Sequence, residues 1–119
     1  MGKLIPDEYL DKIADAIIAA VTHIYMVDDS ATPTDISGTL GNVAVGSGDW
    51  TKSAGDTSGR KLTLATQNIT ATTDGQKRYI VGWDGSAVVF ATPVTVESIA
   101  NGNIYEIPAI DIIEVRDPA

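Results

Sequence analysis

The sequence contains no cysteine, so it can form no disulfide framework, no thiolate metal site and no cysteine nucleophile. No apolar run approaches the roughly 18 residues that a membrane-spanning helix requires. A secretory signal is not expected either, because four acidic residues lie between positions 7 and 15, where its apolar core would stand. We therefore expect a protein that is assembled in a cytoplasm and has no membrane partner.

Basic residues are also scarce: eight lysines and arginines stand against sixteen acidic residues, which gives a formal net charge of -8. An acidic surface repels the phosphate backbone of nucleic acids, so we predict no nucleic-acid partner. The ordinary role of such a charge is to keep a protein soluble, and recognition of a basic partner surface is the alternative.

Only one histidine, His23, is available for general acid–base chemistry. It lies inside a predicted strand, and the chain offers it neither a cysteine partner nor a G-x-S-x-G nucleophile motif. A lone general base is the weaker interpretation, and a structural or solvent-facing histidine is favoured. We predict that the protein is not an enzyme and assign no catalytic residue.

Several acidic residues fall in predicted loops or turns, namely Asp28, Asp29, Asp35, Asp49, Asp56, Asp74 and Asp84. Paired carboxylates can hydrolyse glycosides, and oxygen-rich loops can hold calcium. However, no D-x-D-x-D-G loop is present, and Asp is common in turns because its side chain bonds the local backbone. We therefore predict turn roles for these residues, with no metal and no cofactor.

Two glycine-rich segments and five aromatic residues are the other candidates for ligand contacts. Gly46-Ser47-Gly48 and residues 55–59 are interpreted as turns, because neither has the spacing of a phosphate-binding loop between a strand and a helix. The aromatic residues are predicted to anchor the core or an interface, with stacking on a sugar as the alternative: Trp50, Tyr79, Trp83, Phe90 and Tyr105.

One amphipathic helix is predicted over residues 6–21. Pro6 suits its first turn, and Asp7 and Glu8 lie where the helix dipole favours negative charge. Its apolar residues recur at spacings of three and four and form one stripe: Leu10, Ile13, Ile17 and Val21. We expect this stripe to pack on the sheet of its own domain, and docking on a neighbouring subunit is the alternative.

The rest of the chain predicts short strands separated by turn residues. They are expected at residues 22–27, 40–45, 61–66, 77–83, 87–92, 104–107 and 110–115, with one more starting at Val94. Large apolar side chains are few between residues 34 and 59, so that stretch is predicted to be mostly loop. Asp84-Gly85 predicts a hairpin turn of the tight type that needs positive φ at both central positions.

Together these patterns predict a single domain of mainly β structure, an antiparallel sandwich or barrel-like sheet of about seven short strands with one N-terminal helix. Residues 1–21 would form the N-terminal arm and helix, and residues 22–119 the β domain. The loop-rich region of residues 30–59, together with the N-terminal segment, is expected to carry the partner contacts, because few apolar residues anchor it and it can order on binding.

Five sequence patterns follow one another along nearly the whole chain: I-P-D-E-Y-L-D-K-I, H-I-Y-M-V-D-D, G-D-T-S-G-R-K-L-T-L, Y-I-V-G-W-D-G-S-A-V-V-F and I-A-N-G-N-I-Y-E-I-P-A-I-D-I-I-E-V-R-D-P. In this order the chain resembles the small structural proteins of tailed bacteriophages that are described as head decoration, tail-fibre or minor virion proteins. The resemblance is one of layout, so it carries over no catalytic, cofactor-binding or metal-binding residue.

The resemblance implies a virion protein, assembled in the host cytoplasm and present in many copies. The leading hypothesis is a capsid decoration or cement protein that binds and stabilises the lattice of the major capsid protein. The second is a tail, neck or fibre-attachment component, in which the sheet forms a homo-oligomeric ring or trimer. The third is a carbohydrate-binding or lytic module that uses an exposed Trp50 or Trp83 with nearby acids.

Overall fold

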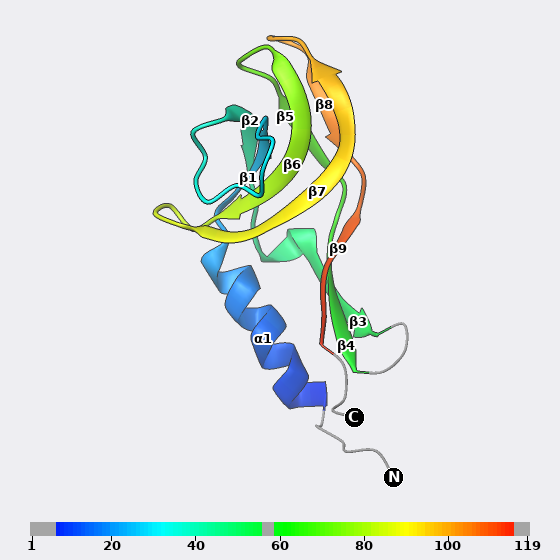
Figure 1. Cartoon of the computed structure of the whole chain (residues 1–119). Coiled ribbons are helices and arrows are strands. Elements are labelled where there is room, and N and C mark those ends of the chain that lie inside the picture. Colours follow the sequence, from blue (N-terminus) through cyan, green and yellow to red (C-terminus); the bar gives the residue numbers. More distant parts are fainter. Residues whose placement is uncertain (1–6, 56–58, 116–119) are drawn as a thin grey trace.

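The computed structural model describes residues 7–55 and 59–115, which fold into one helix and nine strands (Figure 1). In chain order they are α1 (Asp7–Ala20), β1 (His23–Val27), β2 (Thr39–Ala44), β3 (Trp50–Ala54), β4 (Arg60–Leu64), β5 (Gln67–Thr70), β6 (Gly75–Trp83), β7 (Val88–Ile99), β8 (Ile104–Ile107) and β9 (Ile110–Val115). A short 3-10 helix, η1 (Ser47–Asp49), precedes β3. The predicted mainly β architecture with an N-terminal helix is confirmed, with more strands than predicted.

The strands form three antiparallel sheets. The four-stranded sheet has the order β2-β1-β6-β7, the three-stranded sheet β3-β4-β9 and the two-stranded sheet β5-β8. The last two sheets are successive parts of one long ribbon, since β5 follows β4, β8 leads into β9, and the same two chain segments pair throughout. The result is an elongated molecule that measures 52 × 25 × 23 Å (Figure 1).

Two strands, β3 and β5, lie where none was predicted. The stretch of residues 34–59, predicted to be mostly loop, contains β2 and β3, and Leu40 and Trp50 are buried in it. The expectation that residues 30–59 lack an anchor is therefore wrong for these two strands. Strand β2 matches the strand predicted at residues 40–45, whereas the order of β3 comes from its ladder with β4 and is not predicted by its own residues.

Helix α1 packs against the three-stranded sheet, chiefly against β4. It buries Leu10 and Ala14, and Val21 directly after the helix is buried as well, whereas Ile13 is 50% exposed. The prediction is therefore wrong at Ile13. The residues that face the sheet are spaced by four, three and four positions: Leu10, Ala14, the partly buried Ile17 and Val21. The small side chain of Ala14 lets the helix lie close to the sheet.

Two ion pairs attach α1 to the strands beside it. Lys52 Nζ of β3 lies 2.6 Å from Asp15 Oδ1, and Arg60 Nε of β4 lies 3.0 Å from Asp11 Oδ1. The hydrogen bond to Asp15 raises the pKa of the Lys52 ammonium group above its ordinary value. Because these side chains reach solvent, the pairs orient the helix more than they stabilise it.

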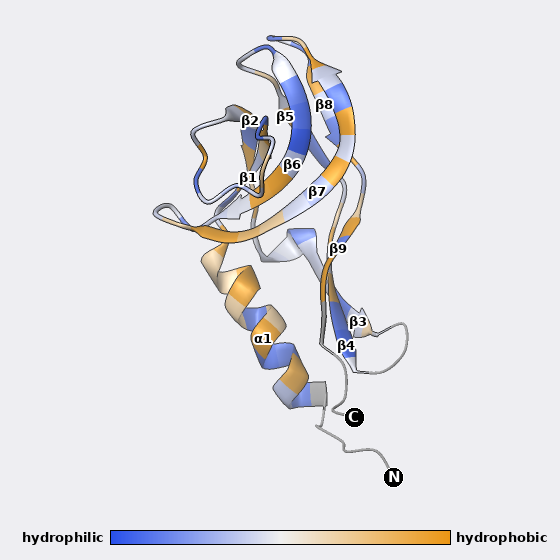
Figure 2. Ribbon diagram, in the orientation of Figure 1, coloured by the Kyte–Doolittle hydropathy of each residue, from blue (hydrophilic) through white to orange (hydrophobic). Residues whose placement is uncertain are grey.

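One hydrophobic core extends through all three sheets and reaches α1. The residues of strand β6 change from hydrophilic to hydrophobic as the strand approaches α1 (Figure 2). The four-stranded and two-stranded sheets bury their facing side chains in the same cluster, which gives a sandwich-like packing. The largest fully buried side chains are Ile24, Met26, Leu62, Leu64, Ile69, Ile80 and Ile107, with Val27 and Val81.

Phe90 of β7 packs against Trp50 at the start of β3. The two rings meet edge to face, with centroids 6.3 Å apart and an interplanar angle of 85°, and Trp50 is 7% exposed. Phe90 also lies across Gly82 of β6, where a Cβ atom would stand 2.2 Å from a ring carbon. An aromatic contact that requires glycine at position 82 thus joins the four-stranded sheet to the three-stranded sheet.

Strand β7 is one strand of 12 residues, although the sequence predicts two short strands separated at Pro93. Proline is tolerated there because β7 is the edge of the four-stranded sheet, so its missing N–H leaves no described neighbour unpaired. The ladder is instead interrupted by a bulge. Lys77 pairs with Glu97 and Tyr79 with Pro93, so residues 94–96 lie opposite a single residue of β6.

The predicted hairpin between β6 and β7 is present, but its turn is not the predicted tight type. The loop covers residues 84–87, and only Gly85 has a positive φ, of 101°, so Asp84 does not adopt the predicted conformation. Instead, Asp84 Oδ1 accepts hydrogen bonds from the backbone N–H groups of Ser86 and Ala87, both at 2.7 Å. The Asp84 carboxylate thus stabilises the turn by accepting hydrogen bonds from its backbone, so Asp84 itself does not need a left-handed conformation.

We predict that Gly82→Ala destabilises the fold by about 1–3 kcal/mol, because the new methyl group overlaps the Phe90 ring and forces it away from Trp50. Urea unfolding gives the free energy of each variant. Gly46→Ala is the control, since no atom lies within 4 Å of a Cβ placed there. Equal stability of the two variants would show that the Phe90 contact is not tight.

We predict that protonation of Asp84 loosens the hairpin turn. The backbone N–H groups of Ala87 and then Ser86 lower the pKa of the Asp84 carboxyl below its ordinary value of 3.8. A lowered pKa means that the ionised form favours the folded turn, so this stabilisation is present above the ordinary pKa and is lost as the pH falls through the lowered one.

Amide chemical shifts of Ser86 and Ala87, followed by NMR during an acid titration, should therefore show a midpoint below 3.8. Asp84→Asn keeps an acceptor oxygen without the charge and should abolish this titration. A midpoint at or above the ordinary value would contradict the assignment.

Candidate functional site

The turn at Asn101-Gly102 separates β7 from β8 instead of pairing them. Two hydrogen bonds to side chains help to hold it: Asn101 N–H donates to Asp74 Oδ1, and Ala100 N–H donates to Tyr105 Oη, each at 2.7 Å. Among the described strands, β7 pairs only with β6 and β8 pairs only with β5. The other edge of each of these two strands is therefore unpaired and open to a ligand.

A groove of about 650 Å³ lies along these open edges. We name it the β7–β8 groove. It is lined by residues 93–97 of β7, by residues 106–108 and Ile110 around the corner between β8 and β9, and by Lys77 of β6. Its volume falls within the range of roughly 300–1,000 Å³ that is usual for ligand pockets.

The walls of the β7–β8 groove are mainly apolar. Val94 and Ile110 are partly buried, and Ile107 is fully buried between them and the core. Pro93 and Pro108 line the groove as well and have no N–H to donate. The groove can therefore take up an apolar group through side-chain contacts, with few backbone donors to bond it.

Three charged residues line the same groove, Lys77, Glu97 and Glu106. The Lys77 side chain is only 8% exposed, and its Nζ donates to Glu97 Oε1 at 2.9 Å. Glu106 is exposed and makes no ion pair with the described residues. Because Glu97 neutralises Lys77, the groove keeps one uncompensated negative charge.

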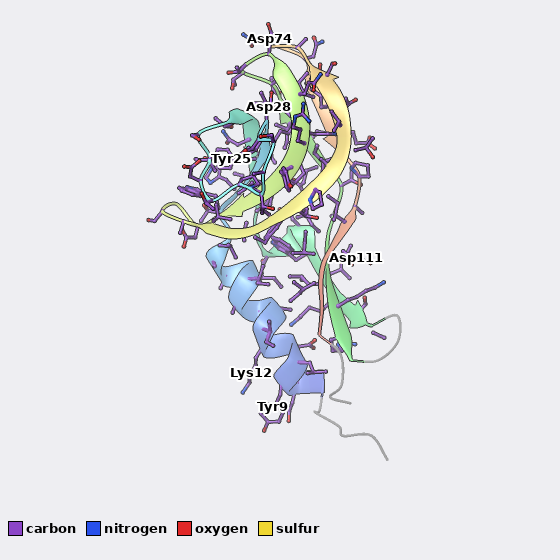
Figure 3. The ribbon with its side chains drawn as sticks, in the orientation of Figure 1. Tyr9, Lys12, Tyr25, Asp28, Asp74 and Asp111 are labelled. Atoms are coloured by element: carbon purple, nitrogen blue, oxygen red, sulfur yellow. The ribbon has the colours of Figure 1, made fainter. Side chains whose placement is uncertain are left out.

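A second apolar surface lies on α1, on the side turned away from β3 and β4. It consists of Tyr9, Ile13 and Ala16, which are all exposed, and we name it the exposed helix face. Lys12 lies over the Tyr9 ring, with Nζ 4.8 Å from the centroid. Figure 3 shows Tyr9 and Lys12 at the lower end of the molecule, whereas β8 lies at its upper end (Figure 1).

His23 lies in β1 beside two other aromatic residues. Its ring is 6.4 Å from that of Tyr25, which in turn lies 6.5 Å from Trp83 in an edge-to-face arrangement. His23 Nδ1 is 3.0 Å from Thr22 Oγ1. Trp50, the other candidate for sugar stacking, is buried. Trp83 is partly buried, with its ring edge to face with that of Tyr25.

Besides Asp84, three of the acidic residues predicted in turns bond the local backbone. Asp29 Oδ1 accepts from Ala31 N–H, Asp35 Oδ1 from Ser37 N–H and Asp49 Oδ2 from Gly46 N–H, and the Ser37 bond lowers the pKa of Asp35. Asp28 and Asp74 bond more distant backbone groups, those of Gln76 and Asn101. Asp56 lies outside the described residues. The described part of the chain contains no group of three potential metal ligands.

An acidic residue outside the predicted set, Asp111 of β9, bonds side chains of the neighbouring strand β4. Its Oδ1 accepts from Thr63 Oγ1 at 2.8 Å, and its Oδ2 lies 3.4 Å from Lys61 Nζ. The Thr63 hydroxyl, followed by the Lys61 charge, lowers the pKa of the Asp111 carboxyl. The carboxylate thus links β4 and β9, which is a structural role.

Of the two glycine-rich segments, Gly46-Ser47-Gly48 lies at a turn, as the sequence predicts, whereas residues 56–58 of the second lie outside the described residues. Gly46 precedes η1, and Gly55 N–H donates to the carbonyl of Gly59 at 2.9 Å, next to residues 56–58.

No family model, curated protein or solved structure matches this chain. Among the described residues, no helix is long and apolar enough to cross a membrane.

Sequence reasoning did not identify the β7–β8 groove. Two prolines could have indicated it, because Pro93 inside a β-rich run and Pro108 between two runs both favour the unpaired edges of sheets. The charge pattern gives no comparable signal, since the pairing of Lys77 with Glu97 follows from the register between β6 and β7.

We predict that Glu97→Gln destabilises the protein more than Lys77→Met does. Without Glu97 the nearly buried Lys77 ammonium group has no carboxylate, which we expect to cost about 1–3 kcal/mol because the site is open on one side. Methionine keeps the apolar stem and removes the charge, so that variant should stay within about 1 kcal/mol of wild type. Urea unfolding gives the free energy of unfolding of each variant. A larger loss of stability for Lys77→Met than for Glu97→Gln would show that Lys77 is solvated.

Proposed function

We propose that this chain is a non-enzymatic structural protein of a tailed-bacteriophage virion, specifically a decoration protein that binds and stabilises the lattice of the major capsid protein in many copies. The observation that carries the proposal is the presence of two exposed apolar surfaces at opposite ends of an elongated molecule. A protein that clamps two neighbouring subunits needs contact surfaces that are set apart in this way.

The distribution of exposed apolar side chains supports a bridging role. The exposed large hydrophobic residues of the described chain fall into two pairs: Tyr9 and Ile13 on α1, and Val96 and Ile104 on β7 and β8. A single exposed apolar residue is ordinary on a protein surface, but Val96 is 53% exposed and lines a groove whose walls are mainly apolar. The long axis of 52 Å gives such a molecule the reach to contact two subunits.

The charge of the protein indicates the kind of surface it would bind. With a formal net charge of -8, it is attracted to basic protein surfaces and repelled by exposed phosphate. These preferences fit a protein partner on the outside of a particle and do not fit packaged nucleic acid. The resemblance to small virion proteins of tailed phages agrees with that placement.

A tail, neck or fibre-attachment component is the second candidate, and the exposed helix face favours it. Tyr9, Ile13 and Ala16 follow a spacing of four and three residues, as in helices that associate with copies of themselves. Self-association through α1 would produce a ring or trimer. Sugar binding gains no comparable support, because Trp50 is buried and neither Trp50 nor Trp83 lines the β7–β8 groove.

We predict that both ends are needed for particle stabilisation. The two test variants are the double substitutions Tyr9→Ser with Ile13→Ser and Val96→Thr with Ile104→Thr. Each alters exposed side chains, so each should fold, bind more weakly and fail to raise the temperature at which particles rupture. The measurement is thermal rupture of phage particles that are stripped of the protein and then supplied with each form.

Ala44→Ser, an exposed change on β2 away from both ends, is the control and should restore wild-type stability. Particle stabilisation that survives loss of either end would contradict bridging. Electron imaging of the same particles would locate the protein, and a single ring at the neck or tail would replace decoration with the second candidate.

A further inference from the structure

We propose that the β7–β8 groove binds an extended segment of a partner protein that places an aliphatic side chain between Pro93 and Pro108, with a neighbouring Lys or Arg beside Glu106. This deepens the proposed function, because it names the chemistry of the partner. Binding of such a segment is also measurable without a particle, so the two proposals can fail separately.

The shape of the groove fits an extended chain rather than a helix. It runs beside the open edges of β7 and β8, which diverge after the turn at Asn101-Gly102. A segment lying between these edges would have strands on both sides. Because Pro93 and Pro108 donate no N–H, a continuous ladder of backbone bonds cannot form there, and side chains must supply most of the contact.

The groove lining selects an aliphatic side chain. Val94 and Ile110 form apolar walls, and Ile107 connects them to the core. The bulge at residues 94–96 displaces this part of β7 from the β6 ladder, and it leaves Val96 exposed at the groove. A valine, isoleucine or leucine from a partner would bury the apolar surface that is now open to water.

The charges of the groove select a basic residue next to that aliphatic one. The Lys77 ammonium group is already paired with Glu97 at 2.9 Å, so it cannot attract an acidic ligand strongly. Glu106, by contrast, has no ion pair among the described residues, and its neighbour across the two-stranded sheet is the neutral Asn68. A lysine or arginine from the partner would provide the missing counter-charge.

Charge also disfavours the other occupants. A second copy of this chain carries the same formal charge of -8, and a nucleic acid carries phosphates, so both are repelled by an acidic groove. A basic segment gains from the field of the whole molecule as well as from Glu106. Charge complementarity therefore favours an extended basic and aliphatic segment.

The test uses the full chain and three fluorescein-labelled hexapeptides: alternating Val and Lys, alternating Ser and Lys, and alternating Val and Glu. In fluorescence anisotropy the Val–Lys peptide should bind, and the other two should bind at least about tenfold more weakly, since each lacks one of the two recognised features. Rising salt should weaken the Val–Lys complex. Equal binding of the Val–Glu peptide would overturn the charge argument, and equal binding of the Ser–Lys peptide would overturn the apolar one.

Variants then assign the binding to the groove. Glu106→Gln should weaken the Val–Lys peptide about threefold and Glu106→Lys about tenfold, because Glu106 is exposed and its replacement leaves the core intact. Glu8→Gln on α1 is the matched control, an exposed acid at the other end of the molecule, and should leave affinity unchanged. If Glu106→Gln and Glu8→Gln bind alike, the groove is not the binding site.

Hydrogen exchange provides the location directly. The Val–Lys peptide should protect residues 93–97 and 106–110, and protection confined to α1 would contradict the proposal.

If wild type binds the peptide in the groove but does not bind phage particles, only the proposed function fails. If wild type stabilises particles but does not bind the Val–Lys peptide in the groove, this inference fails alone.

Discussion

The packing of Phe90 between Gly82 and Trp50 is the contact on which the shape of the molecule depends. Phe90 belongs to the four-stranded sheet, and Trp50 to the three-stranded sheet that carries α1. The ribbon that continues from β4 to β5 and from β8 to β9 also connects the two parts of the molecule, but it is interrupted between these strands. The aromatic contact holds the parts in one orientation, so the surfaces at the two ends keep a fixed separation.

The sequence predicts those helices and strands whose bounds are marked by the residues within and beside them. Strands β8 and β9 were predicted at their observed bounds, and helix α1 within a residue at each end, because apolar periodicity and Pro108 mark them. Strands β3 and β5 could not be predicted in this way. Each offers one large apolar side chain, Trp50 or Ile69, and becomes a strand through pairing with a distant partner.

The candidate site was missed for a related reason. Asn101-Gly102 carries the composition of a hairpin turn, yet the strands that it joins pair with β6 and β5 instead of with each other. The groove results from that divergence and from the bulge in β7, neither of which is visible in composition. Similarly, the sequence could not separate Trp50 from Trp83, since burial of the first depends on Phe90 and on the glycine at position 82.

The pairing of strands that are far apart in the sequence also governs how fast the chain can reach this structure. In the four-stranded sheet His23 pairs with Trp83, and in the three-stranded sheet Arg60 pairs with Val115, so long loops must close before either ladder gains its hydrogen bonds. Folding dominated by such non-local contacts takes on the order of milliseconds to seconds. During synthesis, β1 therefore emerges well before its partner β6 and remains without that neighbour until the ribosome has added the intervening residues.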